Sequence, residues 1–118
     1  MRRPVSLILG VMIGMISTLP TQAQQFSKDH VRAVNAARMR AESINGGLSQ
    51  YRAAKCMYAT SRGGAECLKS TTDGLLFVFG GGAPGWQEEG LPASIETEIH
   101  VSADGSSDID VIYNGAPR

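Results

Sequence analysis

The first residues of the chain determine which part of the sequence forms the folded, mature protein. Two arginines precede an uncharged stretch over residues 5–19, and a small-x-small sequence ending at Ala23 follows it. A positive start, an apolar centre and a small-residue exit are typical of a secretory signal peptide. The stretch is shorter than the roughly 20 apolar residues that span a bilayer, so we expect cleavage, with a retained N-terminal anchor as the alternative. Residues 1–23 are therefore predicted to be a signal peptide and residues 24–118 a single domain.

The predicted mature chain is short, and its charge is unevenly distributed. Its 95 residues are enough for one hydrophobic core, which 6% aromatic content keeps modest. Nine basic and eleven acidic residues disfavour a nucleic-acid partner, because phosphates attract a basic surface. Residues 24–72 hold eight of the bases and three of the acids, whereas residues 73–118 hold one base and eight acids. Either the two halves fold beside each other with their charges solvated or loosely paired, or one of the charged surfaces binds a partner of opposite charge.

The two cysteines of the chain, Cys56 and Cys67, are predicted to form a disulfide. An exported protein matures in an oxidising compartment, where a cysteine pair closes. A redox pair would instead be spaced Cys-x-x-Cys at a helix start. Zinc would need two more ligands, for which the sequence offers His30 and His100. A metal or redox role and free thiols stay as alternatives, and we expect neither a metal nor a cofactor.

Residues 28–44 are predicted to form an amphipathic helix. Ser27 is a typical N-cap, and Asn45-Gly46-Gly47 supplies a left-handed stop. Apolar residues recur every three or four positions, which is the period of one helix face. The stripe has too little apolar area for membrane binding, so we expect no membrane contact after signal cleavage. It consists of Val31, Val34, Ala37, Ala41 and Ile44.

The rest of the chain predicts antiparallel strands. A first strand is expected within residues 48–60 and a short one around Cys67, and the apolar run over residues 75–79 predicts a buried strand. Residues 94–102 alternate cleanly and lead through a turn into residues 109–113, which predicts a hairpin with one buried face. The predicted class is α+β, with the helix packed on a three- to four-stranded antiparallel meander. The expected inward-facing residues are Ile95, Thr97, Ile99, Val101, Ile109, Val111 and Tyr113.

The glycine-rich segment over residues 80–92 is predicted to be a loop. Its first six residues fit Gly-x-Gly-x-x-Gly, but a dinucleotide site needs a helix N-terminus directly afterwards, and Pro84 and Pro92 disfavour one. Trp86 in this loop is interpreted as either a contact surface or a lid on the core. Arg52 is a second candidate for binding.

Four acidic residues are expected to face water on adjacent strands and to form a negative platform for a basic partner or a cation. They are Glu96, Glu98, Asp108 and Asp110. Alternating oxygen-bearing residues also make calcium an alternative ligand, and they are Asp104, Ser106, Asp108 and Asp110. A calcium loop would need oxygens that converge from a curled backbone, whereas this segment predicts a hairpin turn. His100 among these acids is the candidate general base of an alternative, enzymatic interpretation.

Several segments resemble a family of short exported proteins of cyanobacteria. They are Asn45-Gly46-Gly47-Leu48, the run Tyr51-Arg52-Ala53-Ala54-Lys55-Cys56-Met57-Tyr58, Pro84-Gly85-Trp86-Gln87 and Tyr113-Asn114-Gly115-Ala116-Pro117-Arg118. The resemblance implies a location in the periplasm, the thylakoid lumen or the medium, and it carries no activity or catalytic residue. The helix-and-meander layout with Pro84-Gly85-Trp86 also resembles the cystatin inhibitors, whose Gln-x-Val-x-Gly loop is absent here.

The sequence therefore predicts a small exported, non-enzymatic domain that binds a protein partner. The binding surface is expected to combine the loop around Trp86 with the acidic sheet face. Two alternatives remain: a cation-binding or hydrolytic protein that uses the acidic face with His100, and a cystatin-like inhibitor. The candidate binding residues are Trp86, Arg52, Glu96, Glu98, Asp108 and Asp110.

Overall fold

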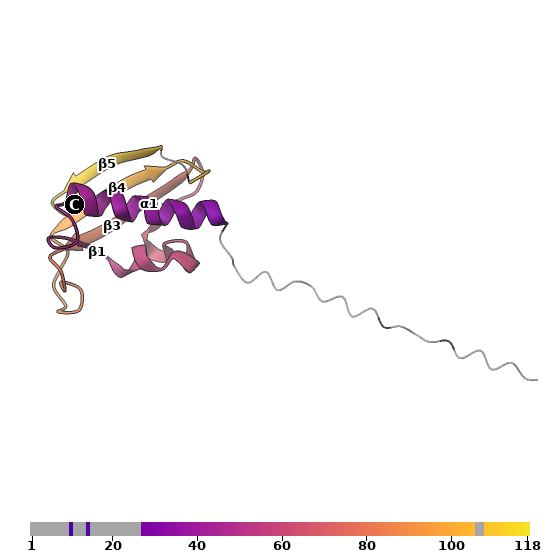
Figure 1. Ribbon diagram of the computed structural model, residues 1–118, viewed down its shortest axis with the longest axis horizontal. Helices are drawn as coiled ribbons and strands as arrows, with labels where there is room; N and C mark the ends of the chain where they lie inside the picture. The colour runs from indigo at the N-terminus through magenta and orange to yellow at the C-terminus, as the bar shows by residue number, and fades with distance from the viewer. Residues whose placement is uncertain (1–9, 11–13, 15–26, 106–107) are drawn as a thin grey trace, which may run out of the picture.

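One helix packs across one face of an antiparallel sheet, which confirms the α+β class. The computed structural model describes Gly10, Gly14 and residues 27–105 and 108–118, so the predicted signal peptide lies almost wholly outside the described residues. Helix α1 (Lys28–Ile44) contacts the central strands, and the strand order is β1-β3-β4-β5 with β2 also paired to β3 (Figure 1). The strands are β1 (Arg52–Ala53), β2 (Leu68–Ser70), β3 (Leu75–Gly82), β4 (Ile95–Val101) and β5 (Ile109–Gly115).

Helix α1 begins and ends where the sequence predicts. The Ser27 side chain accepts a hydrogen bond from the His30 N–H at 3.2 Å, and Gly46, at φ 98°, lies in the left-handed region just beyond the end. The buried stripe includes Ala33, whereas Ile44 is 43% exposed, which differs from the predicted stripe. Small side chains let the helix approach the sheet closely. Its buried residues are Ala33, Val34, Ala37 and Ala41.

The first strand predicted within residues 48–60 is present but much shorter than that range, because only Arg52 and Ala53 pair with β3. The Ala54 N–H donates to the Gly80 carbonyl, and the chain then leaves the sheet. Residues 55–67 form three short 3₁₀ helices that the disulfide Cys56–Cys67 ties together. These helices are η1 (Lys55–Tyr58), η2 (Thr60–Arg62) and η3 (Ala65–Cys67).

Strand β5 contains a bulge that corrects the predicted position of Tyr113. Ile99 is paired with Val111, whereas Glu98 is paired with Tyr113, so Ile112 is an extra residue on β5. Val111 therefore faces the helix as predicted, but Tyr113 lies on the opposite face of the sheet. We call the face under α1 the inner face and the opposite one the outer face.

The core lies between α1 and the inner face of the sheet. Phe77 and Ile99 are fully buried at its centre, and Met57 closes it from the 3₁₀ segment.

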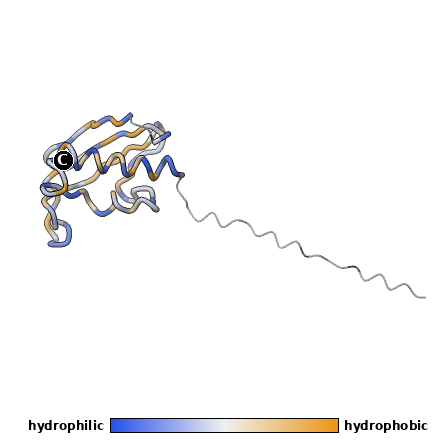
Figure 2. Tube along the Cα trace, viewed as in Figure 1, coloured by the Kyte–Doolittle hydropathy of each residue, from blue (hydrophilic) through white to orange (hydrophobic). Residues whose placement is uncertain are grey.

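None of the helices among the described residues has the length and apolar character that a membrane-spanning helix needs. Figure 2 shows that the connection between β3 and β4 is largely hydrophilic, in contrast to the strands that it joins.

Candidate functional site

The glycine run at the end of β3 is part of the sheet and not of the predicted loop. Gly81 is paired with Ile95 on β4, and Gly82 is paired with Arg52 on β1. A Cβ atom at Gly81 would overlap the buried Tyr51 ring on the inner face, and one at Gly82 would lie 2.9 Å from Cγ of Trp86 on the outer face. Two aromatic rings thus lie against the glycine run from opposite sides. The close approach of these rings explains the absence of side chains there.

Trp86 folds back onto the outer face of the sheet. Its Nε1–H donates to the Arg52 carbonyl at 2.9 Å, and its ring lies over Gly82. Within the loop, the Leu91 N–H donates to the Trp86 carbonyl at 2.9 Å. The indole is only partly buried in this position. It therefore covers glycines on the side away from the core and still presents a ring edge to solvent.

A pocket of about 230 Å³ lies between the Trp86 loop and η1. A second pocket, of about 300 Å³, adjoins it and shares Lys55 and Gln87 as lining residues. The Lys55 N–H donates to Gln87 Oε1 at 2.8 Å, which ties the loop to the 3₁₀ segment. We call the two pockets together the Trp86 groove. Its lining residues are Arg52, Ala53, Lys55, Cys56, Tyr58, Ala59, Arg62, Ala65, Glu66, Trp86, Gln87 and Glu88.

The Trp86 groove carries three cationic side chains. Lys55 Nζ is paired with Glu88 at 3.7 Å, whereas Arg52 and Arg62 have no carboxylate within ion-pair distance among the described residues. Both arginines are exposed. Two guanidinium groups are therefore available to an acidic ligand.

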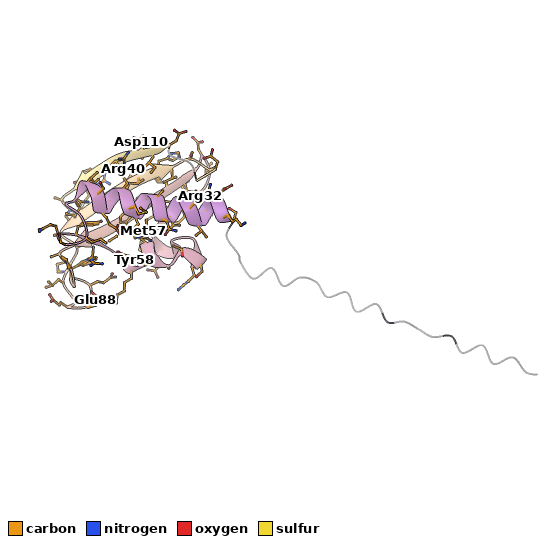
Figure 3. All side chains as sticks on the ribbon, viewed as in Figure 1. Arg32, Arg40, Met57, Tyr58, Glu88 and Asp110 are labelled. Carbon is orange, nitrogen blue, oxygen red and sulfur yellow. A yellow bond between two sulfur atoms is a disulfide. The ribbon has the colours of Figure 1, made fainter. Side chains whose placement is uncertain are left out.

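The Tyr58 side chain forms an aromatic wall of the groove and is held from behind. The Arg38 guanidinium lies 4.7 Å from the centroid of the Tyr58 ring and is paired with Glu42 at 3.3 Å. The Tyr58 hydroxyl donates to the same Glu42 carboxylate at 3.3 Å. This contact from helix α1 orients the ring before any ligand binds. Figure 3 shows Tyr58 and Glu88 on the same side of the molecule, away from Asp110.

The four predicted acidic site residues do not form one open platform. Glu96 and Glu98 lie side by side on the outer face of β4, but Arg118 is paired with them at 2.7 and 3.3 Å. Asp110 is paired in register with His100 near the other end of the strand. Asp108 precedes β5. The structure thus brings two of the four acids together and adds a cation between them.

The histidines bind backbone carbonyl groups in this structure. His100 Nε2 bonds the Asp73 carbonyl, and His30 Nε2 donates to the Gly63 carbonyl at 2.9 Å. Among residues 27–105 and 108–118, no group of three or more His, Cys, Asp or Glu side chains is placed to hold a metal ion. Ser106 of the calcium alternative lies outside the described residues.

Tyr51 combines full burial with an unpartnered hydroxyl. Its side chain is 1% exposed, and its Oη has no hydrogen-bond partner among the described residues. Burial raises the pKa of Tyr51 to about 12. The nearby Thr97 hydroxyl partly opposes this effect, but it donates its proton to Asn114 Oδ1 at 2.7 Å and lies outside hydrogen-bond geometry with Tyr51 Oη. A buried polar group without a partner costs free energy on folding. The Tyr51 side chain therefore stabilises the fold through its ring, which packs on Gly81, and not through its hydroxyl.

Replacing Tyr51 by phenylalanine is expected to leave the fold intact and to change its pH dependence. At pH 7 the variant should be as stable as wild type or about 1 kcal/mol more stable, because an unsatisfied hydroxyl is removed. Above pH 10 the unfolded tyrosine ionises, whereas the folded one stays protonated until about pH 12. Wild type should therefore lose on the order of 1–2 kcal/mol between pH 10 and 12 relative to the variant.

Urea unfolding of both proteins at pH 7, 9, 10.5 and 11.5, followed by circular dichroism, measures this difference. Tyr58→Phe is the matched control, because it removes a hydroxyl from a half-exposed ring outside the core. A constant stability difference between wild type and Tyr51→Phe over this pH range would contradict the prediction.

Comparisons with known proteins found no match to a protein-family model, a curated protein or a solved structure. The disulfide between Cys56 and Cys67 is the predicted one, and it is consistent with an extracytoplasmic location. It also fixes the 3₁₀ segment that forms one wall of the Trp86 groove.

Several residues that line the groove or its surroundings are not among the site residues that the sequence predicts. Lys55, Tyr58 and Gln87 fall inside the segments that resemble other exported proteins, but residues 55–58 were predicted to form a strand. Arg118 is the one basic residue in the sequence from 73 to 118, next to eight acidic residues. This isolated positive charge is the signal that could have linked it to Glu96 and Glu98. Nothing local marks Tyr113, because its position depends on the bulge.

Proposed function

We propose that this protein is a small exported, non-enzymatic binding domain whose Trp86 groove takes an acidic segment of a protein partner. The observation that carries the proposal is the pair of unpaired guanidinium groups, Arg52 and Arg62, in a groove with aromatic walls. The signal-peptide pattern and the disulfide support export. The resemblance to short exported cyanobacterial proteins supports the periplasm, the thylakoid lumen or the medium as the compartment.

The chemistry of the groove matches a carboxylate-bearing chain. A guanidinium group donates two parallel hydrogen bonds to a carboxylate, which is stronger and more directional than a neutral hydrogen bond. The rings of Trp86 and Tyr58 offer flat apolar surface to the carbon atoms of the same ligand. Glu66 and Glu88 also lie in the groove, and they would disfavour a ligand whose carboxylates fall at those points.

Preorganisation strengthens this interpretation. The Trp86 indole is fixed to the Arg52 carbonyl, Gln87 is fixed to the Lys55 backbone, and the disulfide holds the opposite wall. A ligand would therefore not have to order these elements, which lowers the cost of binding. The side chains of Arg52 and Arg62 are the parts that a ligand would still have to order.

A fluorescence titration with blocked hexaglutamate tests the proposal, with blocked hexaglutamine as the uncharged control peptide. Trp86 is the single tryptophan of the sequence, so its emission reports on the groove. We expect hexaglutamate to change the emission and hexaglutamine not to. Arg52→Gln should weaken hexaglutamate binding about tenfold or more, because a charge-assisted hydrogen bond is worth about 1.5–3 kcal/mol.

Arg40→Gln is the matched control variant for this titration. Arg40 is exposed on helix α1, and Figure 3 places it on the side away from Tyr58 and Glu88. The control should bind hexaglutamate within about twofold of wild type, since exposed charges beyond the Debye length of about 8 Å are largely screened at physiological salt. Equal binding of both peptides, or equal weakening by both substitutions, would overturn the proposal.

A further inference from the structure

The bulge in β5 places an aromatic ring beside two carboxylates on the outer face. Regular alternation after Val111 would put Tyr113 on the inner face, but the extra residue Ile112 reverses the order. Tyr113 then lies opposite Glu98, and Glu96 follows two residues away on the same side of β4. Bulges commonly redirect a side chain near a functional site.

The Tyr113 side chain contacts the residues that follow it in the chain. Its hydroxyl donates to the Ala116 carbonyl at 2.5 Å. A Cβ atom at Gly115 would lie 3.1 Å from the Tyr113 Oη, so the glycine leaves room for the ring. These contacts within residues 113–116 hold the ring in place, and one of its faces lies against the Arg118 guanidinium.

A guanidinium group already occupies the space between the ring and the carboxylates. The Arg118 Cζ atom lies 3.7 Å from the centroid of the Tyr113 ring. Arg118 Nε donates to Glu96 Oε2 at 2.7 Å, and Nη2 donates to Glu98 Oε1 at 3.3 Å. Glu96, Glu98 and Tyr113 thus contact the guanidinium from three sides, and we call them the Tyr113 cradle.

We propose that the Tyr113 cradle is an arginine-binding site, which Arg118 occupies in the free protein and which an arginine side chain of a basic protein segment takes in its place. The ligand class follows from the occupant, because Arg118 shows that the cradle accepts a planar guanidinium by stacking and by two charge-assisted hydrogen bonds. Lysine has no planar group for the ring and no fork for the two carboxylates, so it is expected to bind more weakly.

The contact made by Arg118 can be exchanged. The Arg118 side chain is 47% exposed, and the two glutamate side chains are 21% and 23% exposed, so water reaches the cradle. Exposed ion pairs are individually weak. Arg118 nevertheless competes at a high effective concentration, because it is five residues from Tyr113 in the same chain. A partner with a single arginine should therefore bind poorly until Arg118 is displaced or removed.

The test titrates a blocked Gly-Arg-Gly peptide into full-length wild type and Arg118→Gln, with Gly-Lys-Gly as the control peptide. The NMR signals of the Tyr113 ring and of the Glu96 and Glu98 amides report on the cradle directly. In Arg118→Gln we expect Gly-Arg-Gly to shift these signals and to bind at least tenfold more tightly than in wild type. Gly-Lys-Gly should bind Arg118→Gln at least threefold more weakly than Gly-Arg-Gly.

A charge control separates the cradle from general attraction to acids. Adding Glu96→Gln and Glu98→Gln to Arg118→Gln should weaken Gly-Arg-Gly binding at least tenfold, whereas adding Asp110→Asn should change it by less than twofold. Circular dichroism checks that each variant is folded. Tyr113→Leu in the Arg118→Gln background is a second variant that removes the ring and keeps both carboxylates, and it should also weaken binding.

Two results would overturn the proposal. One is equal affinity of Gly-Arg-Gly for wild type and Arg118→Gln. The other is an equal effect of the glutamate and Asp110 substitutions, which would indicate attraction to the acidic half as a whole. The proposal does not depend on the Trp86 groove, since Arg52→Gln is expected to leave Gly-Arg-Gly binding unchanged.

Discussion

Replacing Gly81 by alanine is expected to destabilise the domain by about 3 kcal/mol, an overpacking loss at the upper end of the usual range. The added Cβ would overlap the Tyr51 ring, which is 1% exposed and packed in the core. The ring cannot move outward without leaving a cavity, and β3 cannot move without breaking its pairs with β1 and β4. Urea unfolding followed by circular dichroism measures the loss.

A double-mutant cycle with Tyr51→Ala identifies the cause. Tyr51→Ala alone should also be destabilising, because it empties a large core position. The loss from Gly81→Ala should then shrink in the Tyr51→Ala background, since the ring that it overlaps is gone. Gly82→Ala is the matched control, because its Cβ would meet the partly exposed Trp86 ring, which is freer to shift. Full additivity of Gly81→Ala and Tyr51→Ala would contradict this explanation.

Replacing both Cys56 and Cys67 by alanine is expected to cost about 3 kcal/mol of stability. The disulfide closes a loop between residues 11 apart in sequence, and in the chain-entropy model a closure of that length restricts the unfolded chain by about this amount. Hydrogen bonds from His30 and Arg38 and the buried Met57 side chain also hold the 3₁₀ segment, so loss of the bridge should loosen the segment without unfolding the domain. The same variant should therefore bind hexaglutamate more weakly, because one wall of the Trp86 groove is released.

Thermal unfolding of wild type with and without reductant, next to the double alanine variant, tests the expected loss. Reduced wild type and the variant should melt at similar temperatures, both below oxidised wild type. The prediction would be contradicted if the double alanine variant or reduced wild type melted at the same temperature as oxidised wild type, because the bridge would then not be required for stability.

The helix and the β4–β5 hairpin were predictable because their signals are local. Helix α1 needs a cap at Ser27, a stop after Asn45 and a stripe at helical spacing, and each of these is readable over a few residues. Strand β4 alternates with period two, and its residues Thr97 and Ile99 are buried as predicted. The disulfide was predictable from the cysteine count combined with the expected export.

The failed predictions share one cause, which is contact between residues far apart in sequence. Strand β1 ends at Ala53 because the chain leaves β3 there and enters the disulfide-bonded 3₁₀ segment. The glycine run belongs to β3 because Tyr51 and Trp86 pack on its two faces. The acidic platform is partly neutralised because Arg118 folds back and pairs with Glu96 and Glu98 on β4.

By itself the sequence determined the class of the fold, helix α1, the β4–β5 hairpin and the separation of charge between two halves of the chain. These properties follow from side-chain period and composition, which act over a few residues. Only the tertiary structure decided which groups meet: Trp86 with the glycine run and Tyr113 with Arg118. It also placed Arg52 and Arg62 in the two adjoining pockets of the Trp86 groove. The physical reason is that these contacts depend on pairing between residues far apart in sequence, and the extra residue in β5, which reverses the face of Tyr113, is defined only by strand pairing.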